Sequence, residues 1–143
     1  MRISTKGRYS LEALLYMAML PAGTYSSTKS ISEHTGISDG YLEQLFIPLR
    51  KAGIVKGVRG PQGGYMPAKE AGAISVGDIL RAVEGPMELV DCIRSTRCPA
   101  QDDCVSRHTW RELYEAVNCF IDSVSLENLS EAYRGLDYQD YTI

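Results

Sequence analysis

Apolar residues recur at helical spacing near the start of the chain. Residues 10–20 carry their apolar side chains on one face and Pro21 follows directly, which predicts a helix over this range. A second, shorter helix is expected after a Ser/Thr-rich connection. Ser30 and Glu33 have the spacing of a capping box, so this helix is expected to begin at Ser30 and to end at Gly36.

The third helical pattern is amphipathic and follows Gly36 closely. Ser38 is suited to an N-cap position. The apolar face of the helix consists of Leu42, Leu45, Phe46 and Leu49. Pro48 lies within the pattern and predicts a bend or an early end, because proline lacks a backbone N–H. A short helix, a Gly-containing turn and a longer amphipathic helix together predict a helix-turn-helix.

Two short apolar segments, residues 55–59 and 65–66, flank a turn rich in glycine and proline at residues 60–64. This pattern predicts a β-hairpin. A hairpin directly after a helix-turn-helix is the wing of a winged helix. The expected fold class is therefore mostly α, a winged helix-turn-helix with a small β-hairpin wing and a long C-terminal dimerisation helix.

Three further helices are expected in the second half of the chain. The first covers residues 75–83, a long one runs from about Cys104 to Val124, and a short one covers residues 125–133. The apolar stripe of the long helix includes three residues spaced seven apart, Trp110, Val117 and Val124. This heptad-like spacing suggests pairing with another helix.

Charge divides the chain into two unlike halves. Residues 1–69 carry nine Lys/Arg and four Asp/Glu, a net +5, whereas residues 70–143 carry six and fourteen, a net −8. A basic front half suits a polyanionic partner. The apolar fraction of 44% is enough to form a core. The best apolar run, residues 11–22, contains Glu12 and is too short to span a bilayer, so we expect a cytoplasmic protein with no membrane partner.

Side chains on the third helix and the hairpin are suited to DNA. Gln44 can bond to adenine and Glu43 can accept from cytosine N4, with Tyr41 beside them. Phosphate and groove contacts are expected from the basic residues Arg2, Lys6, Arg8, Lys29, Arg50, Lys51, Lys56 and Arg59. Arg59, at the tip of a slim hairpin, is suited to a minor groove. The alternative is a winged helix that contacts protein, with charges that are simply solvated.

Three cysteines, Cys92, Cys98 and Cys104, are separated by five residues each, and His108 follows them. In a reducing compartment, clustered cysteines indicate metal ligation or redox chemistry more than structural disulfides. Thiolates ligate iron–sulfur clusters and zinc, but these gaps are wider than the usual zinc spacing. Redox-inert cysteines or a disulfide pair are the alternatives. Cys119 lies too far along the helix to join the same group and is interpreted as a structural or interface cysteine.

Several stretches of the sequence resemble one family. They are the start of the chain (1–9), the turn with its helix (36–46 and 49–53), the hairpin (58–65) and the triple-cysteine loop. Together they resemble the Rrf2 family of bacterial transcription regulators, from residue 1 to about residue 130. The resemblance implies a winged-helix homodimer whose long helix pairs with its twin and reaches under the partner's DNA-binding domain. Each protomer then inserts a helix into a major groove, so double-stranded DNA with an imperfectly palindromic operator is expected.

The resemblance also carries roles onto individual residues. It implies cluster ligation by Cys92, Cys98 and Cys104. The residues that match the family's recognition helix and wing are Ser38, Tyr41, Glu43, Gln44, Arg59 and Gly60. In the family member with a switchable cluster, the glutamate matching Glu43 discriminates between two classes of DNA site by repelling one of them. The cluster itself is implied to change which DNA the dimer prefers.

The sequence departs from the family at the fourth cluster ligand. Cluster-bearing members have a histidine three residues after the third cysteine, where this chain has Arg107, with His108 next. Because both spacings share a helix face, His108 can still reach a cluster held by Cys104. Other branches recruit a ligand from the partner's first helix, and Glu12 matches one such position. We expect an iron–sulfur cluster, with 2Fe-2S favoured and 4Fe-4S as the alternative.

The predicted organisation has four parts. Residues 1–85 form the DNA-binding domain, 86–108 the cluster-binding loop, 104–133 the dimerisation helix with a short following helix, and 134–143 a tail. The predicted function is a DNA-binding repressor or activator that senses cluster, redox or nitrosative status. A cluster-free or zinc-binding thiol-redox repressor is the first alternative, and an iron–sulfur electron-transfer protein the second. An enzyme is not expected, since no nucleotide-binding loop or nucleophile–base pair stands out.

Overall fold

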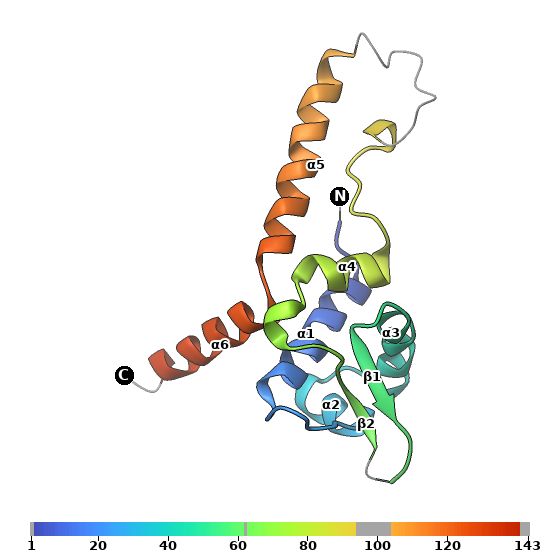
Figure 1. Cartoon of the computed structure of the whole chain (residues 1–143), viewed down its shortest axis with the longest axis vertical. Coiled ribbons are helices and arrows are strands. Elements are labelled where there is room, and N and C mark those ends of the chain that lie inside the picture. The colour runs from blue at the N-terminus through green and yellow to red at the C-terminus, as the bar shows by residue number, and fades with distance from the viewer. Residues whose placement is uncertain (1, 62, 94–103, 141–143) are drawn as a thin grey trace.

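The structure, a computed structural model, describes residues 2–61, 63–93 and 104–140. Its elements in chain order are α1 (Thr5–Met19), α2 (Thr28–Thr35), α3 (Asp39–Lys51), β1 (Val55–Val58), β2 (Gly64–Pro67), the 3-10 helix η1 (Ala71–Ala73), α4 (Val76–Glu84), the 3-10 helix η2 (Asp91–Ile93), α5 (Val105–Ser123) and α6 (Leu126–Asp140). Figure 1 shows α1 to α4 and the hairpin as one body, from which α5 rises as an arm and α6 projects sideways. The described part is mostly helical with one two-stranded sheet, so the predicted fold class is confirmed.

The first helix begins earlier than the sequence pattern predicted. α1 starts at Thr5, after Ser4, rather than at Ser10. The backbone N–H of Ser4 donates to Glu84 Oε1 of α4 at 2.6 Å, which provides a partner for the start of the helix. Gly7 is buried at this contact, and a Cβ there would lie 2.6 Å from Glu84 Oε1. The early start therefore depends on a residue far along the chain.

Serines begin the next two helices, one of them not as predicted. Ser27, rather than Ser30, is the N-cap of α2, and its hydroxyl accepts from the Ser30 N–H at 3.1 Å. The predicted capping box of Ser30 is therefore wrong. Ser38 caps α3 as predicted, accepting from the Tyr41 N–H at 3.3 Å. Of the two effects expected at Pro48, a bend or an early end, the early end is wrong, because α3 continues to Lys51.

The core fills the space between α1, α2, α3, α4 and the base of the hairpin. Its largest fully buried side chains are Phe46, Leu14, Ile31, Leu42, Leu49, Ile74, Ile79, Leu126 and Val55. Four predicted inward positions of α3 are thus all buried. Leu126, at the start of α6, belongs to the same core, so α6 is anchored to the body at its first residue.

The hairpin has the predicted position and a tie to the start of α2. β1 and β2 pair antiparallel in a register that runs from Val55 opposite Pro67 to Val58 opposite Gly64. Ser26 and Tyr65 exchange two backbone hydrogen bonds, each of 2.8 Å. The hairpin is therefore held against the segment that enters α2 and projects from the body as a free tip (Figure 1).

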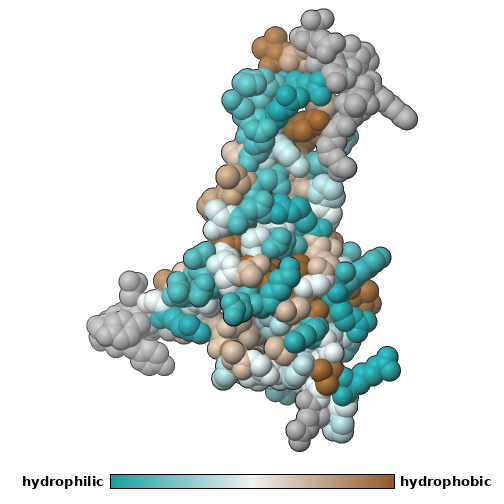
Figure 2. Space-filling view, in the orientation of Figure 1, coloured by the Kyte–Doolittle hydropathy of each residue, from teal (hydrophilic) through white to brown (hydrophobic). Residues whose placement is uncertain are grey.

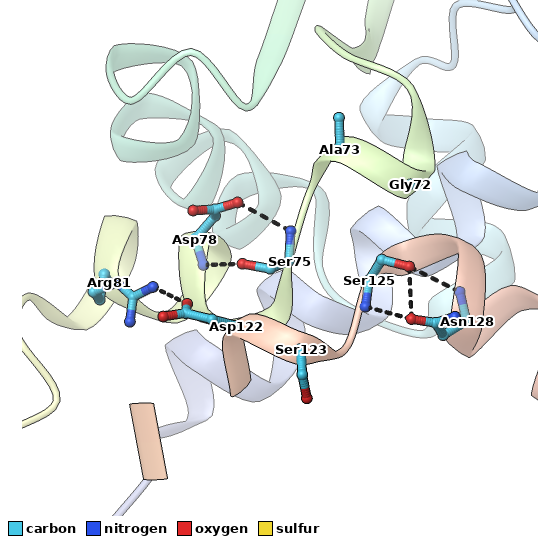
Figure 3. A pocket seen from close by; sticks show the side chains of 9 residues that line it. All are labelled: Gly72, Ala73, Ser75, Asp78, Arg81, Asp122, Ser123, Ser125 and Asn128. Carbon is cyan, nitrogen blue, oxygen red and sulfur yellow. Dashed lines mark hydrogen bonds and ion pairs between the residues drawn. The ribbon is translucent and has the colours of Figure 1, made fainter. Parts of the chain in front are cut away.

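A junction of backbone and side-chain bonds joins α4, α5 and α6 (Figure 3). The Val76 N–H donates to the Val124 carbonyl at 2.8 Å, and the Leu126 N–H donates to the Ile74 carbonyl at 2.9 Å. Beside these bonds, the Arg81 guanidinium of α4 pairs with Asp122 of α5. The junction fixes the direction in which α5 leaves the body.

Two side-chain caps flank this junction. Ser75 and Asp78 form a capping box at the start of α4, with both hydrogen bonds 3.0 Å long. Ser125 and Asn128 bond in the same reciprocal way at the start of α6. α6 then continues to Asp140, beyond the end near Tyr133 that the sequence pattern predicted.

The apolar stripe of α5 is only partly covered. Ile121 is buried against Leu80 and Met87. Phe120, on the same turn, is 68% exposed, and Leu113, farther along the arm, is 44% exposed. Figure 2 shows hydrophobic atoms among polar ones along the column that α5 forms. Across the described ranges, none of the helices combines the length and hydropathy needed to cross a membrane.

Candidate nucleic-acid interface and cysteine loop

The exposed face of α3 carries the predicted base-reading residues. Glu43, Gln44, Arg50 and Lys51 are all exposed, because the opposite face of the helix is buried in the core. Tyr41 is half-buried, and its ring meets the Tyr9 ring edge-on with centroids 5.8 Å apart. The helix thus presents two acceptor or donor side chains followed by two cations, an arrangement suited to base edges and phosphates.

The wing lies beside this helix and encloses a groove with it. The groove has a volume of about 400 Å³ and is lined by Ser27, Thr28, Glu43, Arg50, Gly57, Val58, Arg59, Gly60, Gly63, Gly64 and Tyr65. Arg59 and Gly60 are exposed near the tip, and Gly60 has a φ of 121° that favours glycine. Two arginines and one glutamate therefore face a single opening between helix and wing.

Tyr65 on β2 links the wing to α3 through Glu43. Its hydroxyl donates to Glu43 Oε2 at 3.3 Å, and its ring stacks on Phe46 with centroids 4.3 Å apart. Burial raises the pKa of the Tyr65 hydroxyl, with a further increase from the Glu43 charge and a smaller opposing effect of Arg50. Tyr65 was not among the residues expected to act at the site, although its place in the second strand of the predicted hairpin pointed to it.

The basic residues at the chain start lie far from the wing tip. Arg2 and Lys6 are exposed around the beginning of α1, which Glu84 holds through Ser4. Figure 1 shows the N-terminus at the opposite end of the body from the hairpin tip, with α3 between them. The predicted cations therefore extend over the whole length of the body.

Two of the three loop cysteines lie within the described residues. Cys92 is half-buried in η2, which packs against α5, and Cys104 is half-buried directly before α5. Cys98 lies outside the described ranges. A hydrogen bond from the Ser106 hydroxyl, 3.3 Å from the sulfur, is the largest cause that lowers the pKa of the Cys104 thiol, followed by the Arg107 backbone N–H.

The donor chemistry fits an iron–sulfur group, since thiolates are its usual ligands. Cys92 and Cys104 are both free thiols at the two ends of the loop. Within residues 2–61, 63–93 and 104–140, three or more His, Cys, Asp or Glu side chains do not come together as a metal site. The third thiol of the predicted set, Cys98, is not among these residues.

Within the described ranges, the two candidates for the fourth ligand have other neighbours than a cysteine. His108 is exposed, and its Nε2 lies 3.2 Å from Glu112 Oε1 one turn along α5. Glu12 is exposed on α1 and lines a hollow of about 480 Å³ with Tyr16 and other residues. Figure 1 shows α1 in the body and the start of α5 at the far end of the arm. Within one chain, Glu12 and Cys104 are therefore distant.

A recognition helix with an exposed polar face, next to a basic wing, defines a winged-helix DNA-binding protein. The family model of Rrf2, described as an iron-dependent transcriptional regulator, matches residues 3–132. The chain belongs to the Rrf2 family of transcriptional regulators.

Relatives and solved structures agree with this assignment. The chain is 40% identical over 140 residues to the HTH-type transcriptional regulator IscR of Xenorhabdus nematophila. This match covers 98% of this chain and 85% of that protein. T. potens IscR is 35% identical with a TM-score of 0.74, covering 100% of this chain and 92% of that one. CymR, the global cysteine regulator of B. subtilis, is 40% identical with a TM-score of 0.77, covering 92% and 98%.

Proposed function

We propose that the protein is a cytoplasmic, homodimeric regulator that reads an imperfectly palindromic DNA operator through α3 and the wing. The observation that carries this proposal is the groove of about 400 Å³ between them, lined by Glu43, Arg50 and Arg59. α3 enters the major groove, with Tyr41 and Gln44 toward base edges. Arg59 enters the adjacent minor groove, and Arg2, Lys6, Ser38, Arg50, Lys51 and Gly60 contribute to backbone contacts.

Dimerisation is supported by the uncovered stripe on α5. Leu113 and Phe120 are 44% and 68% exposed on a helix that stands clear of the body. Exposed apolar side chains of this size at helical spacing indicate a packing partner. A second copy of α5 supplies the same stripe, and a two-fold dimer presents two recognition helices to two DNA half-sites.

The cofactor that we propose is an iron–sulfur cluster, 2Fe-2S in preference to 4Fe-4S, held by Cys92, Cys98 and Cys104. His108 is the first candidate for the fourth ligand, and Glu12 of the partner subunit is the second. When bound, such a group supplies redox and nitric-oxide reactivity and is labile when iron is scarce. The lowered pKa of the Cys104 thiol supports this role, because the thiolate is the ligating form.

The residues of the chain provide a route from the loop to the DNA-reading surface. The loop begins after α4 and ends at α5, and the Arg81–Asp122 pair joins these two helices. α4 in turn packs against α1 and α3. A change in the loop is expected to shift the position of α3 by this route. Such a population shift regulates DNA binding only if the two arrangements differ in affinity for DNA.

A second candidate function is a cluster-free or zinc-binding repressor that responds to thiol redox state. The observation that favours it is the similarity to CymR, whose described function is cysteine regulation. The triple-cysteine loop favours the cluster instead, because it offers three thiolates at five-residue gaps, which are wider than the usual zinc spacing. An iron–sulfur electron carrier from another functional class would not need the groove between α3 and the wing.

One experiment separates the cluster-bearing regulator from the cluster-free or zinc-binding repressor. The protein is purified without oxygen, its visible absorption is recorded, and iron, acid-labile sulfide and zinc are quantified per dimer. Stoichiometric iron and sulfide with visible colour support the cluster, and the spectrum distinguishes 2Fe-2S from 4Fe-4S. A protein that stays colourless and iron-free after anaerobic reconstitution contradicts the cluster and supports the thiol or zinc repressor.

A further inference from the structure

Tyr65 connects three parts of the DNA-reading surface. Its backbone exchanges two 2.8 Å hydrogen bonds with Ser26, before α2. Its ring stacks on the buried Phe46 of α3, and its hydroxyl donates to Glu43 Oε2 at 3.3 Å. Gly57 stands opposite Tyr65 in the hairpin, and a Cβ there would lie 3.3 Å from the ring. The ring therefore has a fixed place, and its hydroxyl points at one carboxylate.

We propose that Tyr65 is a positioning residue that sets the DNA sequence preference of the protein by holding the Glu43 carboxylate in the groove between α3 and the wing. The inference rests on the proposed DNA-reading function and deepens it. Tyr65 itself is not assigned a base contact. It acts through Glu43, whose charge is the group that a base edge or a phosphate meets.

The energetics favour an effect on selectivity more than on overall affinity. Glu43 is exposed and has several rotamers available, so a single hydrogen bond from a fixed phenol selects among them. A carboxylate held in one position accepts a hydrogen bond from cytosine N4 at one base pair. The same carboxylate repels a base that presents an acceptor at that position. A carboxylate that moves freely discriminates less, because it can withdraw from an unfavourable base.

Arg50 makes the position of Glu43 consequential. Both side chains line the same groove, and the charge of Arg50 has the smallest of the effects on the pKa of the Tyr65 hydroxyl, opposite in direction to that of Glu43. Without the hydroxyl, Arg50 is the competing partner for the Glu43 carboxylate. The hydrogen bond from Tyr65 thus leaves Arg50 available to a phosphate while Glu43 faces the bases.

The test compares base preferences of purified full-length variants. Wild-type protein selects a site from a randomised palindromic duplex library, and dissociation constants are measured for that site with each base pair replaced in turn. In Tyr65→Phe, which keeps the ring, we expect discrimination at one base pair per half-site to fall by about threefold to tenfold, with little change in affinity for the selected site. Tyr133→Phe, on exposed α6, is the matched control and keeps the wild-type profile.

A double-mutant cycle with Glu43→Ala identifies the route. If Tyr65 acts through Glu43, adding Tyr65→Phe to Glu43→Ala causes no further change in discrimination. Glu43→Asp, which keeps the charge on a shorter stem at an exposed position, tests the same contact without altering the wing. We expect it to lose discrimination at the same base pair.

Three results overturn the inference or its basis. An unchanged profile in Tyr65→Phe, or in Glu43→Asp, shows that the hydrogen bond does not position the carboxylate for reading. Additive losses in the double variant show that Tyr65 acts by another route. Failure of the wild-type protein to select any sequence contradicts the proposed function itself, and the inference falls with it.

Discussion

Glu84, the last residue of α4, accepts hydrogen bonds from both the backbone N–H and the hydroxyl of Ser4, the residue before α1. A carboxylate at the N-terminus of a helix is favourable because of the helix dipole and the unpaired N–H groups there. The loop that carries the cysteines begins directly after Glu84. The end of α4 is therefore fixed to the start of the chain at the point where the segment that carries Cys92 leaves the body.

The first prediction concerns the stability provided by this contact. Glu84→Ala removes the acceptor of both Ser4 bonds, and we expect the free energy of unfolding to fall by about 1 kcal/mol, as for the loss of a helix cap. Urea denaturation followed by circular dichroism measures the change. Glu131→Ala, on exposed α6, is the control and should remain within about 0.5 kcal/mol of wild type. Equal stability of Glu84→Ala and wild type would contradict the role of the contact.

The second prediction concerns the wing. Arg59→Ala should weaken binding to the operator by about threefold to tenfold and reduce the slope of log affinity against log salt by about one unit. Iron content should not change, since Arg59 lies near the hairpin tip, whereas Cys92 lies in η2 and Cys104 directly before α5. Titration at several salt concentrations measures both effects. Arg134→Ala, on exposed α6, supplies a control with the same loss of charge. Identical binding curves for the two variants would show that the wing does not contact DNA.

The third prediction concerns the dimer. Phe120→Asp places a charge on the exposed apolar stripe of α5, so we expect a shift from dimer to monomer in analytical ultracentrifugation. Cys119→Asp adds the same charge one residue earlier but on the side of the helix that faces away from Trp110. The control should stay dimeric. A monomer from Cys119→Asp and a dimer from Phe120→Asp would assign the interface to the other face.

The fourth prediction concerns the cofactor. Cys98→Ala should abolish visible colour and bound iron, and with them any change in operator preference between the two cofactor states, while the protein remains a folded dimer. Cys119→Ala should retain both the cluster and the change in preference, because Cys119 is exposed near the C-terminal end of α5, whereas the loop meets the N-terminal end. Iron and sulfide analysis after anaerobic purification measures the first effect. Full cluster content in Cys98→Ala would contradict the proposed ligand set.

Local patterns predicted the parts of the fold that depend on neighbouring residues. The apolar face of α3, the Ser38 cap and the hairpin each follow from residues within a few positions of one another, and the structure confirms them. The Ser30 cap is wrong because Ser27, three residues earlier, offers an equivalent hydroxyl. Sequence spacing alone does not rank two serines that can each begin a helix.

Contacts between distant residues account for what the sequence did not predict. α1 starts early because Glu84, eighty positions away, accepts from Ser4. Tyr65 and Glu43 are 22 residues apart and meet only because the hairpin folds back on α3. Amphipathic spacing in α5 predicted an apolar stripe, but only the structure shows that Ile121 is buried while Phe120 is exposed.

The junction of α4 and α6 has a consequence for how such a protein can evolve. Two backbone hydrogen bonds, Val76 to Val124 and Leu126 to Ile74, hold the base of α5, and backbone bonds do not depend on which side chains are present. Mutations in the distal part of α5 and in the loop therefore leave the attachment of α5 to the body unchanged. We expect lineages with this fold to exchange one sensory chemistry for another without rebuilding the DNA-reading body.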